Sequence, residues 1–266
     1  SFKTAAGEQI GVKVASSFIS PEQAARNLDA EIGKDGFDQT QAKAKQAWET
    51  QLARVRVEDP DLDNRRTFYS ALYRMLQFPR MFYEIDAKGK PVHYSPYDGK
   101  VHAGFMYTDN GFWDTWRAVF PFFAMMYPER DSEMMQGLVN TVKEGGWLPE
   151  WASPGYRDVM IGSNSANIIA DAYANGVRGF DTETLYKAMV KNATTSAGRP
   201  TDKKGDVVSA VGREGVEYYN RLGYVPYDVG INENAARTLE YATADFSLSR
   251  FAAALDRVRE RMRFAE

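Results

Sequence analysis

Apolar side chains recur at helical spacing along most of the chain. Phe68, Leu72 and Met75 form one such stripe in a segment that follows Pro60 and ends before Pro79. A capping serine at Ser20 and later Gly or Pro residues mark further helix boundaries. The pattern predicts additional helices at about 20–33, 38–55, 114–127, 131–143, 163–176, 182–194, 213–221 and 233–263.

The N-terminal segment has a different periodicity. Residues 9–18 place Ile10, Val12 and Val14 between small or polar residues, which is typical of a half-buried strand. Because one strand cannot stand alone, we expect it to pair later in the chain or to be the last strand of a preceding domain. Residues 79–112 are rich in Tyr, Gly, Asp and Pro and predict a long irregular or hairpin excursion.

Helices in series, joined by loops of uneven length, predict an array of helical hairpins. The sequence lacks the strand–helix alternation of Rossmann folds and TIM barrels, which leaves a bundle or an α/α toroid. Aromatic, glycine-rich loops favour the toroid, in which about seven helices make roughly half of a six-hairpin ring. The segment Arg263–Glu266 keeps a helical pattern without a stop signal, so we expect the fold to continue at both ends.

Composition narrows the possible partners. At 266 residues, with 44% hydrophobic and 26% charged side chains, the chain can bury a large core. Its 33 basic and 36 acidic residues are spread along the length, so neither nucleic acid nor an acidic membrane is an expected partner. No stretch approaches the roughly 20 apolar residues of a membrane span. With no cysteine and two histidines, any metal would be bound by oxygen, which favours calcium or magnesium.

Four of the five tryptophans lie between residues 113 and 151, beside acidic residues. Trp113 and Trp116 flank Asp114, and Glu150 stands directly before Trp151. Sugar rings stack on indole faces through their C–H groups, while carboxylates accept hydrogen bonds from their hydroxyls. Glycoside hydrolysis ordinarily uses two carboxyl groups, and Asp114 with Glu150 is the natural pair to test. The pattern predicts a carbohydrate-active enzyme.

Each of these residues also has a structural interpretation. We expect Arg117 to hold Asp114 for bidentate contact with sugar hydroxyls, whereas the alternative is a carboxylate that stabilises a helix N-terminus. The alternative for Glu150 is an exposed loop glutamate. Ser163 is predicted to cap the helix at 163–176, and Asp171 to be a structural residue of that helix.

Several segments resemble, in the same order, motifs of glycoside hydrolase family 92, the calcium-dependent exo-α-mannosidases. They are Tyr107–Arg117, which contains Gly111-Phe112-Trp113-Asp114-Thr115-Trp116-Arg117, then Glu144–Trp151, then Met160-Ile161-Gly162, and finally Ile169–Tyr173. The segment Ser17–Glu31 also resembles the passage from that family's N-terminal β-sandwich to its catalytic domain.

The resemblance implies a mainly α chain with three parts. Residues 1–19 would end the N-terminal β-sandwich, residues 20–58 would form a helical linker, and residues 59–266 would be the first half of an (α/α)6 catalytic domain. The implied activity is inverting hydrolysis of terminal α-linked mannose, in which Ca²⁺ helps to hold and distort the sugar. The implied partners are a mannose-containing glycan and the remainder of the same protein. The implied location is the periplasm, the cell surface or the exterior of a bacterium.

The predicted substrate-binding residues are Trp113, Asp114, Arg117, Trp147, Glu150, Trp151 and Met160. The family's acid lies in a Glu-Gly-Asn-x-Trp-like motif and its base in an Asp-rich stretch that leads to Gln-Met-Ser. Neither motif occurs in residues 1–266, so the resemblance places the catalytic pair outside them, with Glu150 and Asp114 as the alternative pair. It identifies no metal ligand here. Val159 stands where the family often has cysteine, so a pocket contact there would differ.

Two other functions remain compatible with the sequence. Trehalase-like (α/α)6 glycosidases also carry a Trp-Asp segment, and a preference for glucosides would select them. A noncatalytic carbohydrate-binding fragment would bind sugar without turnover.

Overall fold

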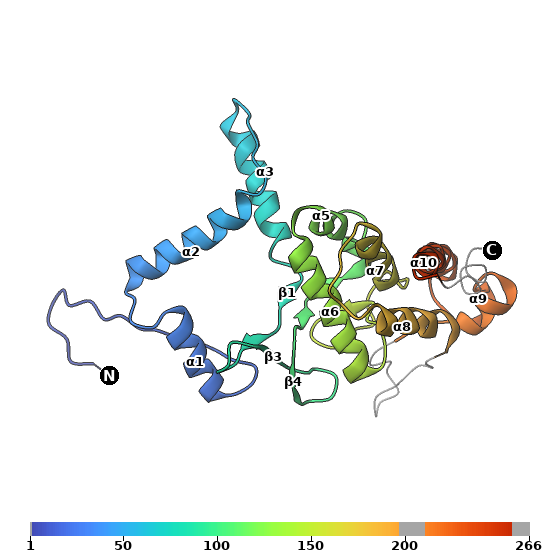
Figure 1. Ribbon diagram of the computed structural model, residues 1–266, viewed down its shortest axis with the longest axis horizontal. Helices are drawn as coiled ribbons and strands as arrows, with labels where there is room; N and C mark the ends of the chain where they lie inside the picture. The colour runs from blue at the N-terminus through green and yellow to red at the C-terminus, as the bar shows by residue number, and fades with distance from the viewer. Residues whose placement is uncertain (1, 197–210, 257–266) are drawn as a thin grey trace.

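The computed structural model describes residues 2–196 and 211–256, which are mostly helical, as predicted (Figure 1). The helices are α1 Pro21–Glu31, α2 Phe37–Leu52, α3 Leu62–Met75, α4 Phe112–Thr115, α5 Val119–Met126, α6 Pro128–Gly145, α7 Ser165–Ala174, α8 Thr182–Thr194, α9 Val216–Leu222 and α10 Asn234–Ala254, with a 3-10 turn η1 at Tyr227–Val229. The segment predicted as one helix at 114–127 is divided into α4 and α5. The end of the helix predicted at 233–263 lies outside the described residues.

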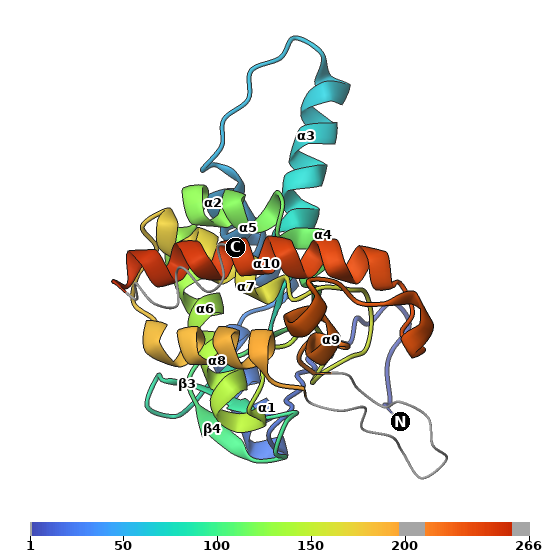
Figure 2. The same ribbon diagram turned by 90° about the vertical axis from the view of Figure 1, so that its right-hand side faces the viewer.

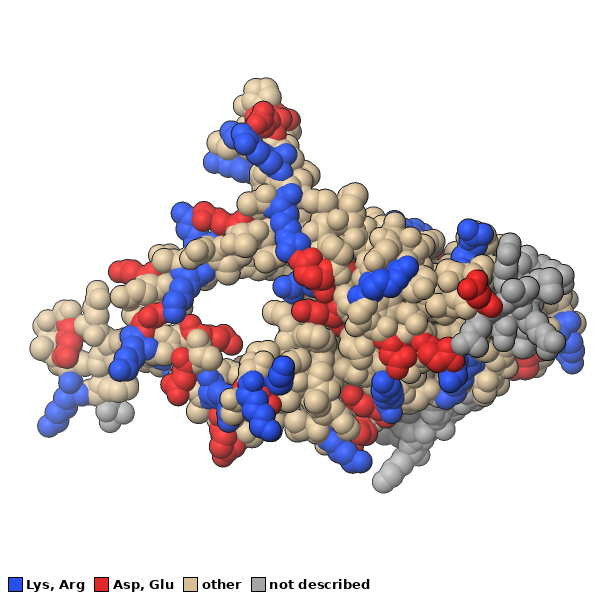
Figure 3. Space-filling view, in the orientation of Figure 1, with Lys and Arg blue, Asp and Glu red and all other residues tan. Residues whose placement is uncertain are grey.

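The first three helices form a frame that stands away from the body of the molecule (Figure 1). As predicted, Ser20 caps α1, because its Oγ accepts a hydrogen bond from the Gln23 backbone N–H at 3.1 Å. Together α1, α2 and α3 bury only Gln23 and Leu72. Figure 3 shows an opening between this frame and the helical body. The frame therefore contributes little to the core.

The strand predicted at residues 9–18 does not pair with any later segment that the structure describes. This segment runs without strand hydrogen bonds, and Ile10, Val12 and Val14 are 43%, 72% and 78% exposed. The alternating pattern alone does not make a strand, because its backbone groups need a neighbouring strand and the described residues offer none here. The assignment of residues 1–19 to a β-sandwich stays a prediction.

Residues 79–112 were predicted to be irregular or to form hairpins. The structure shows short antiparallel strands here, which agrees with the second form. The strands are β1 Arg80–Met81, β2 Glu84–Ile85, β3 Pro91–Tyr94, β4 Val101–Ala103, β5 Tyr107–Thr108, β6 Asn110–Gly111 and, later in the chain, β7 Trp151–Ala152. They pair as β1–β5, β2–β3–β4 and β6–β7. The β6–β7 pair is the one that joins two of the tryptophan-containing segments.

The core lies among α5, α6, α7, α8 and α10. Helix α10 packs against α7 and also contacts α8 (Figure 2). Its buried face includes Tyr241, Leu248 and Phe251, while α7 contributes Ile168 and Ile169. This packing fixes the start of α7 and the loop that precedes it against α10, and that region holds the candidate site.

Candidate functional site

The β6–β7 pair brings the two predicted motifs together. Gly111 lies opposite Trp151, and the Phe112 backbone N–H donates to the Glu150 carbonyl at 3.3 Å. A Cβ atom at Gly111 would lie 2.1 Å from Cζ3 of Trp151, so the indole can rest on this backbone only because residue 111 is glycine. Trp113 follows Phe112 in α4.

Trp113 is anchored by a residue far along the chain. Its indole N–H donates to Glu240 Oε1 of α10 at 3.2 Å, and Arg117 Nη2 lies 3.3 Å from the same oxygen. Arg117 also donates from Nη1 to the Trp113 carbonyl at 2.9 Å, and its Cζ lies 5.4 Å from the centroid of the Trp113 ring. Trp113 remains 36% exposed.

The expectation that Arg117 holds Asp114 is wrong. The guanidinium of Arg117 is taken by Glu240 and the Trp113 carbonyl, and it also stacks on the Trp116 ring at 4.6 Å. Asp114 is exposed and makes no hydrogen bond or ion pair with any described residue. Its carboxylate is therefore open to a ligand, and its role in sugar binding stays a prediction.

Glu150 is not the exposed loop residue of the alternative interpretation. Its Oε1 accepts hydrogen bonds from Ser165 Oγ at 3.3 Å and Asn192 Nδ2 at 3.4 Å. Its Oε2 is shielded and has no partner in the described parts of the chain. Burial raises the pKa of Glu150 well above its ordinary value, although the positive charge of Arg213 and the hydrogen bonds from Ser165 act in the opposite direction. This environment favours the protonated carboxyl, which can donate a hydrogen bond.

Arg213 is the buried cation of this region. It is 3% exposed, its Nε donates to Ser163 Oγ at 2.7 Å, and its Nη1 lies 2.7 Å from Asp245 Oδ1. The prediction that Ser163 caps the following helix is wrong, because its hydroxyl accepts from Arg213 and Asn164 occupies the cap position of α7. A buried arginine paired in this way fixes the loop before α7 beside Glu150.

The remaining predicted site residues divide into packed and open ones. Trp147 is covered by Lys191, whose Nζ lies 4.0 Å from the ring centroid and donates to the Gly146 carbonyl at 2.8 Å. A Cβ at Gly212 would lie 2.9 Å from the same indole. Met160 is 47% exposed and has a left-handed backbone with φ 63°, which strains a residue other than glycine.

Comparison with known proteins places these motifs in a family. Residues 23–266 match the model of the glycosyl hydrolase family 92 catalytic domain. The chain belongs to this family. It is similar to the structure of a family 92 inverting mannosidase from Bacteroides thetaiotaomicron, with 46% identity, a TM-score of 0.86, and coverage of 94% of this chain and 33% of that one.

Two further family 92 relatives give the same picture. A family 92 alpha-mannosidase structure from Bacteroides thetaiotaomicron is 26% identical, with a TM-score of 0.79 and coverage of 94% and 31%. An uncharacterized secreted glycosidase from Arthroderma benhamiae is 28% identical over 251 residues, which cover 90% of this chain and 27% of the relative. The chain thus spans about a third or less of the length of these relatives.

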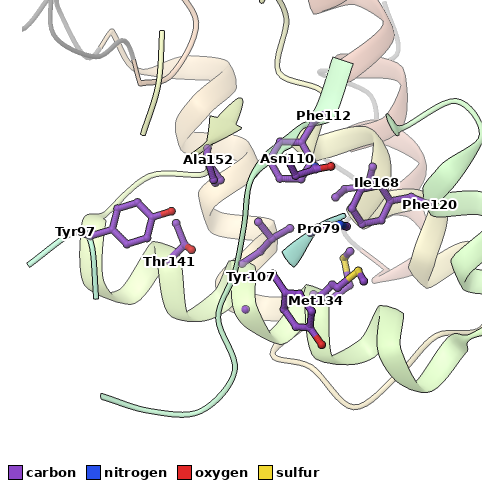
Figure 4. Close-up of a pocket in the computed structure, with 14 residues that line it drawn as sticks. Pro79, Tyr97, Tyr107, Asn110, Phe112, Phe120, Met134, Thr141, Ala152 and Ile168 are labelled. Carbon is purple, nitrogen blue, oxygen red and sulfur yellow. The ribbon is translucent and has the colours of Figure 1, made fainter. Parts of the chain in front are cut away.

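A small enclosed cavity lies behind β6 in this family 92 chain. Figure 4 shows Asn110, Phe112, Phe120 and Thr141 around it. Its volume of about 20 Å³ is far too small for a sugar and sufficient for about one water molecule. This cavity is therefore not a sugar-binding pocket.

Within residues 2–196 and 211–256, no three His, Asp or Glu side chains converge as metal ligands. The calcium dependence implied by the family resemblance therefore stays a prediction. In the same residues, none of the helices has the length and apolar composition needed to cross a membrane.

Sequence reasoning missed Glu240 and Arg213. Both are single charged residues in segments without a recognisable motif, and each meets its partner across 50 or more positions. Glycines give the only local signal. Gly162, in the motif before α7, has φ 92°, and a Cβ there would lie 3.0 Å from Cβ of Glu240. Close approach of another element is a common reason for such a glycine.

Proposed function

We propose that this chain supplies the mannose-binding part of the catalytic domain of an exo-α-mannosidase, which releases terminal α-linked mannose from glycans by inverting hydrolysis. The supporting observation is the β6–β7 pair, which joins the segment that leads to the exposed residues Trp113 and Asp114 to the segment that contains Glu150 and Trp151, in a family 92 fold. The 46% identity to an inverting mannosidase supports the sugar and the stereochemistry. The complete (α/α)6 ring is part of the proposal.

The chemistry of the side chains suggests their roles. Asp114 would accept hydrogen bonds from two sugar hydroxyls, and the Trp113 indole would stack on the sugar C–H groups. Glu150, whose carboxyl group is shielded and accepts hydrogen bonds from Ser165 and Asn192, would order the loop beside the sugar site. We assign the acid and base of hydrolysis to motifs that residues 1–266 do not contain. A calcium requirement and a periplasmic or secreted location also belong to the proposal.

The test is mannose release from α-1,2-mannobiose, with calcium and with chelator, by residues 1–266 and by a longer polypeptide that includes them. We expect chelator-sensitive release only from the longer polypeptide. Asp114→Asn should weaken sugar binding by about tenfold or more, since a negatively charged hydrogen-bond acceptor is replaced by a neutral amide. Asp38→Asn, on the exposed surface of α2, is the matched control.

Each other outcome contradicts a different part of the proposal. Release by residues 1–266 alone would move the catalytic roles to Asp114 and Glu150. Hydrolysis of glucosides in preference to mannosides would identify a trehalase-like enzyme. Saturable sugar binding with no turnover, even by the longer polypeptide, would identify a carbohydrate-binding protein.

A further inference from the structure

Glu240 connects three segments that are far apart in the sequence. One of its oxygens, Oε1, accepts from the Trp113 indole N–H at 3.2 Å and lies 3.3 Å from Arg117 Nη2. Its other side faces Gly162, where a Cβ would lie 3.2 Å from Oε2. The side chain thus joins α10 to the Trp113 segment and to the loop that precedes α7.

The carboxyl group of Glu240 lies inside the packing, not on the surface. Its side chain is 15% exposed, and Oε2 is shielded from solvent without a hydrogen-bond partner among the residues described. A carboxylate in such a position makes charge-assisted hydrogen bonds that are stronger than neutral ones. Glu240 is therefore a firm anchor for the indole.

Two contacts together leave the Trp113 ring little freedom. The N–H bond to Glu240 fixes the direction in which the indole edge points, while the Arg117 guanidinium lies over the ring at 5.4 Å. Arg117 is in turn held by Glu240 and by the Trp113 carbonyl. Glu240 therefore determines the position of both groups with one oxygen.

We propose that Glu240 is a positioning residue of the sugar site. It holds the Trp113 indole and the Arg117 guanidinium against α10, so that the exposed part of the indole and the adjacent Asp114 meet the mannose ring. The choice of mannose as the ligand rests on the proposed function. The claim that Glu240 fixes the Trp113 indole does not depend on it. A preordered indole binds sugar without first losing rotational freedom, which improves affinity.

The experiment uses residues 1–266 labelled with ¹⁵N, in which each of the five tryptophans gives one indole N–H signal. Hydrogen exchange at Trp113 is measured against the other indoles, and binding of methyl α-D-mannopyranoside is followed by titration of the same signals. The variants are Glu240→Ala and Glu240→Gln. Glu217→Gln, an exposed glutamate of α9, is the control.

We expect Glu240→Ala to speed exchange at Trp113 selectively by about tenfold and to weaken mannoside binding by about tenfold, the loss typical of a charged hydrogen bond. Glu240→Gln keeps an acceptor for the indole, so exchange should stay close to that of the unmodified chain while affinity falls less. Glu217→Gln should change neither. Glu240→Gln also tests the inference if the alanine variant does not fold, because its amide is isosteric.

The outcomes separate this inference from the proposed function. Two results for Glu240→Ala would overturn the positioning role. One is an exchange rate at Trp113 that rises no more than the rates of the other indoles, and the other is a mannoside affinity within twofold of that of the unmodified chain. If the unmodified chain binds no mannoside, the proposed function fails, whereas selective exchange at Trp113 still decides whether Glu240 fixes the indole.

Discussion

The two ends of helix α6 each hold a buried carboxylate, and the fold treats them in opposite ways. Glu144, in the last turn, lies 2.9 Å from His93 Nε2, and His93 Nδ1 lies 2.8 Å from the Gly104 carbonyl. Asp131, in the first turn, is fully buried, and neither of its oxygens has a partner among the described residues. One carboxylate has a counter-charge and the other has none.

Protonation follows from this difference. Both nitrogens of His93 lie within hydrogen-bond distance of an acceptor, the Glu144 carboxylate and the Gly104 carbonyl, which favours the doubly protonated ring. Burial by itself favours the neutral ring, but these two hydrogen bonds outweigh it and raise the pKa of His93. Burial, together with the negative charge of Asp171 on α7, raises the pKa of Asp131 to about 7. A buried charge persists where the fold supplies a partner and is otherwise neutralised.

The position of each group gives the difference a functional meaning. Glu144 directly precedes the Gly145–Trp151 segment, so the ion pair ties β3 to the loop that carries Glu150. Asp131 lies at the other end of the helix, away from the candidate site. The His93–Glu144 contact therefore supports the candidate site, while the opposite end of α6 contains Asp131, whose effect on folding stability changes with pH.

The largest expected effect comes from removal of the partner of Glu144. His93→Ala leaves a buried carboxylate unpaired, which typically costs about 3–5 kcal/mol of folding stability. The free energy of unfolding in urea at pH 6 measures it. Because the pKa of His93 is raised in the fold, its contribution is full at acidic pH and is lost as pH rises through the folded pKa.

His102 provides a matched control in the neighbouring strand. It lies opposite His93 and contacts Asp98 at 2.9 Å, but its side chain is 35% exposed. His102→Ala should cost less than about 1 kcal/mol, as exposed ion pairs do. Equal losses of folding stability in His93→Ala and His102→Ala would show that the buried His93–Glu144 pair stabilises the fold no more than an exposed pair does.

Asp131→Asn should have the opposite sign and a smaller size. With a folded pKa of about 7 against an ordinary value near 3.8, the unmodified chain loses stability as pH rises from about 4 to about 7. The loss is on the order of 2–4 kcal/mol, and the asparagine variant should not show it. Urea unfolding at pH 5 and pH 8 should find the variant more stable than the unmodified chain, mainly at pH 8.

Glu129→Gln tests whether any lost charge in the first turn of α6 has the same effect. Glu129 is exposed and pairs with Arg54, and the hydrogen bond from Arg54 lowers the pKa of Glu129. Its contribution is present above its ordinary pKa and is lost as pH falls, so glutamine should give no gain at pH 8. A gain equal to that of Asp131→Asn would point to general charge repulsion instead of burial.

These features show where sequence reasoning succeeds. Helix α8 was predicted at residues 182–194 and has those bounds, because its apolar spacing and the capping Asp181 are local signals. Trp113 and Glu150 were found together because their motifs are short and continuous. Glu144 lies in a recognised motif, but its pairing with His93 was not predicted, since the contact spans 51 positions.

The same limit explains where the structure differs from the predictions. Ser163 is a good capping residue by type, but Arg213 approaches from 50 positions away and takes its hydroxyl. Val12 and Val14 have strand-like spacing, but a strand also requires a neighbour that no local pattern specifies. Sequence periodicity thus identifies helices and motifs, whereas charge pairing is decided by packing.

Asp171→Asn gives the smallest effect and separates the two causes of the raised pKa of Asp131. Asp171 is only partly buried, and its Oδ1 accepts from Asn175 Nδ2 at 3.0 Å, a contact that asparagine retains. We expect stability to change by less than about 1 kcal/mol, because the group is partly solvated.

The decisive measurement is the titration of the Asp131 carboxyl carbon by NMR in the Asp171→Asn variant. Burial is the larger cause of its shift, so the pKa should fall from about 7 but stay well above 3.8. A return to the ordinary value would mean that the charge of Asp171 alone controls Asp131. The two ends of α6 would then differ in the sign of their neighbouring charge, a cation beside Glu144 and an anion beside Asp131, and burial would have no separate role.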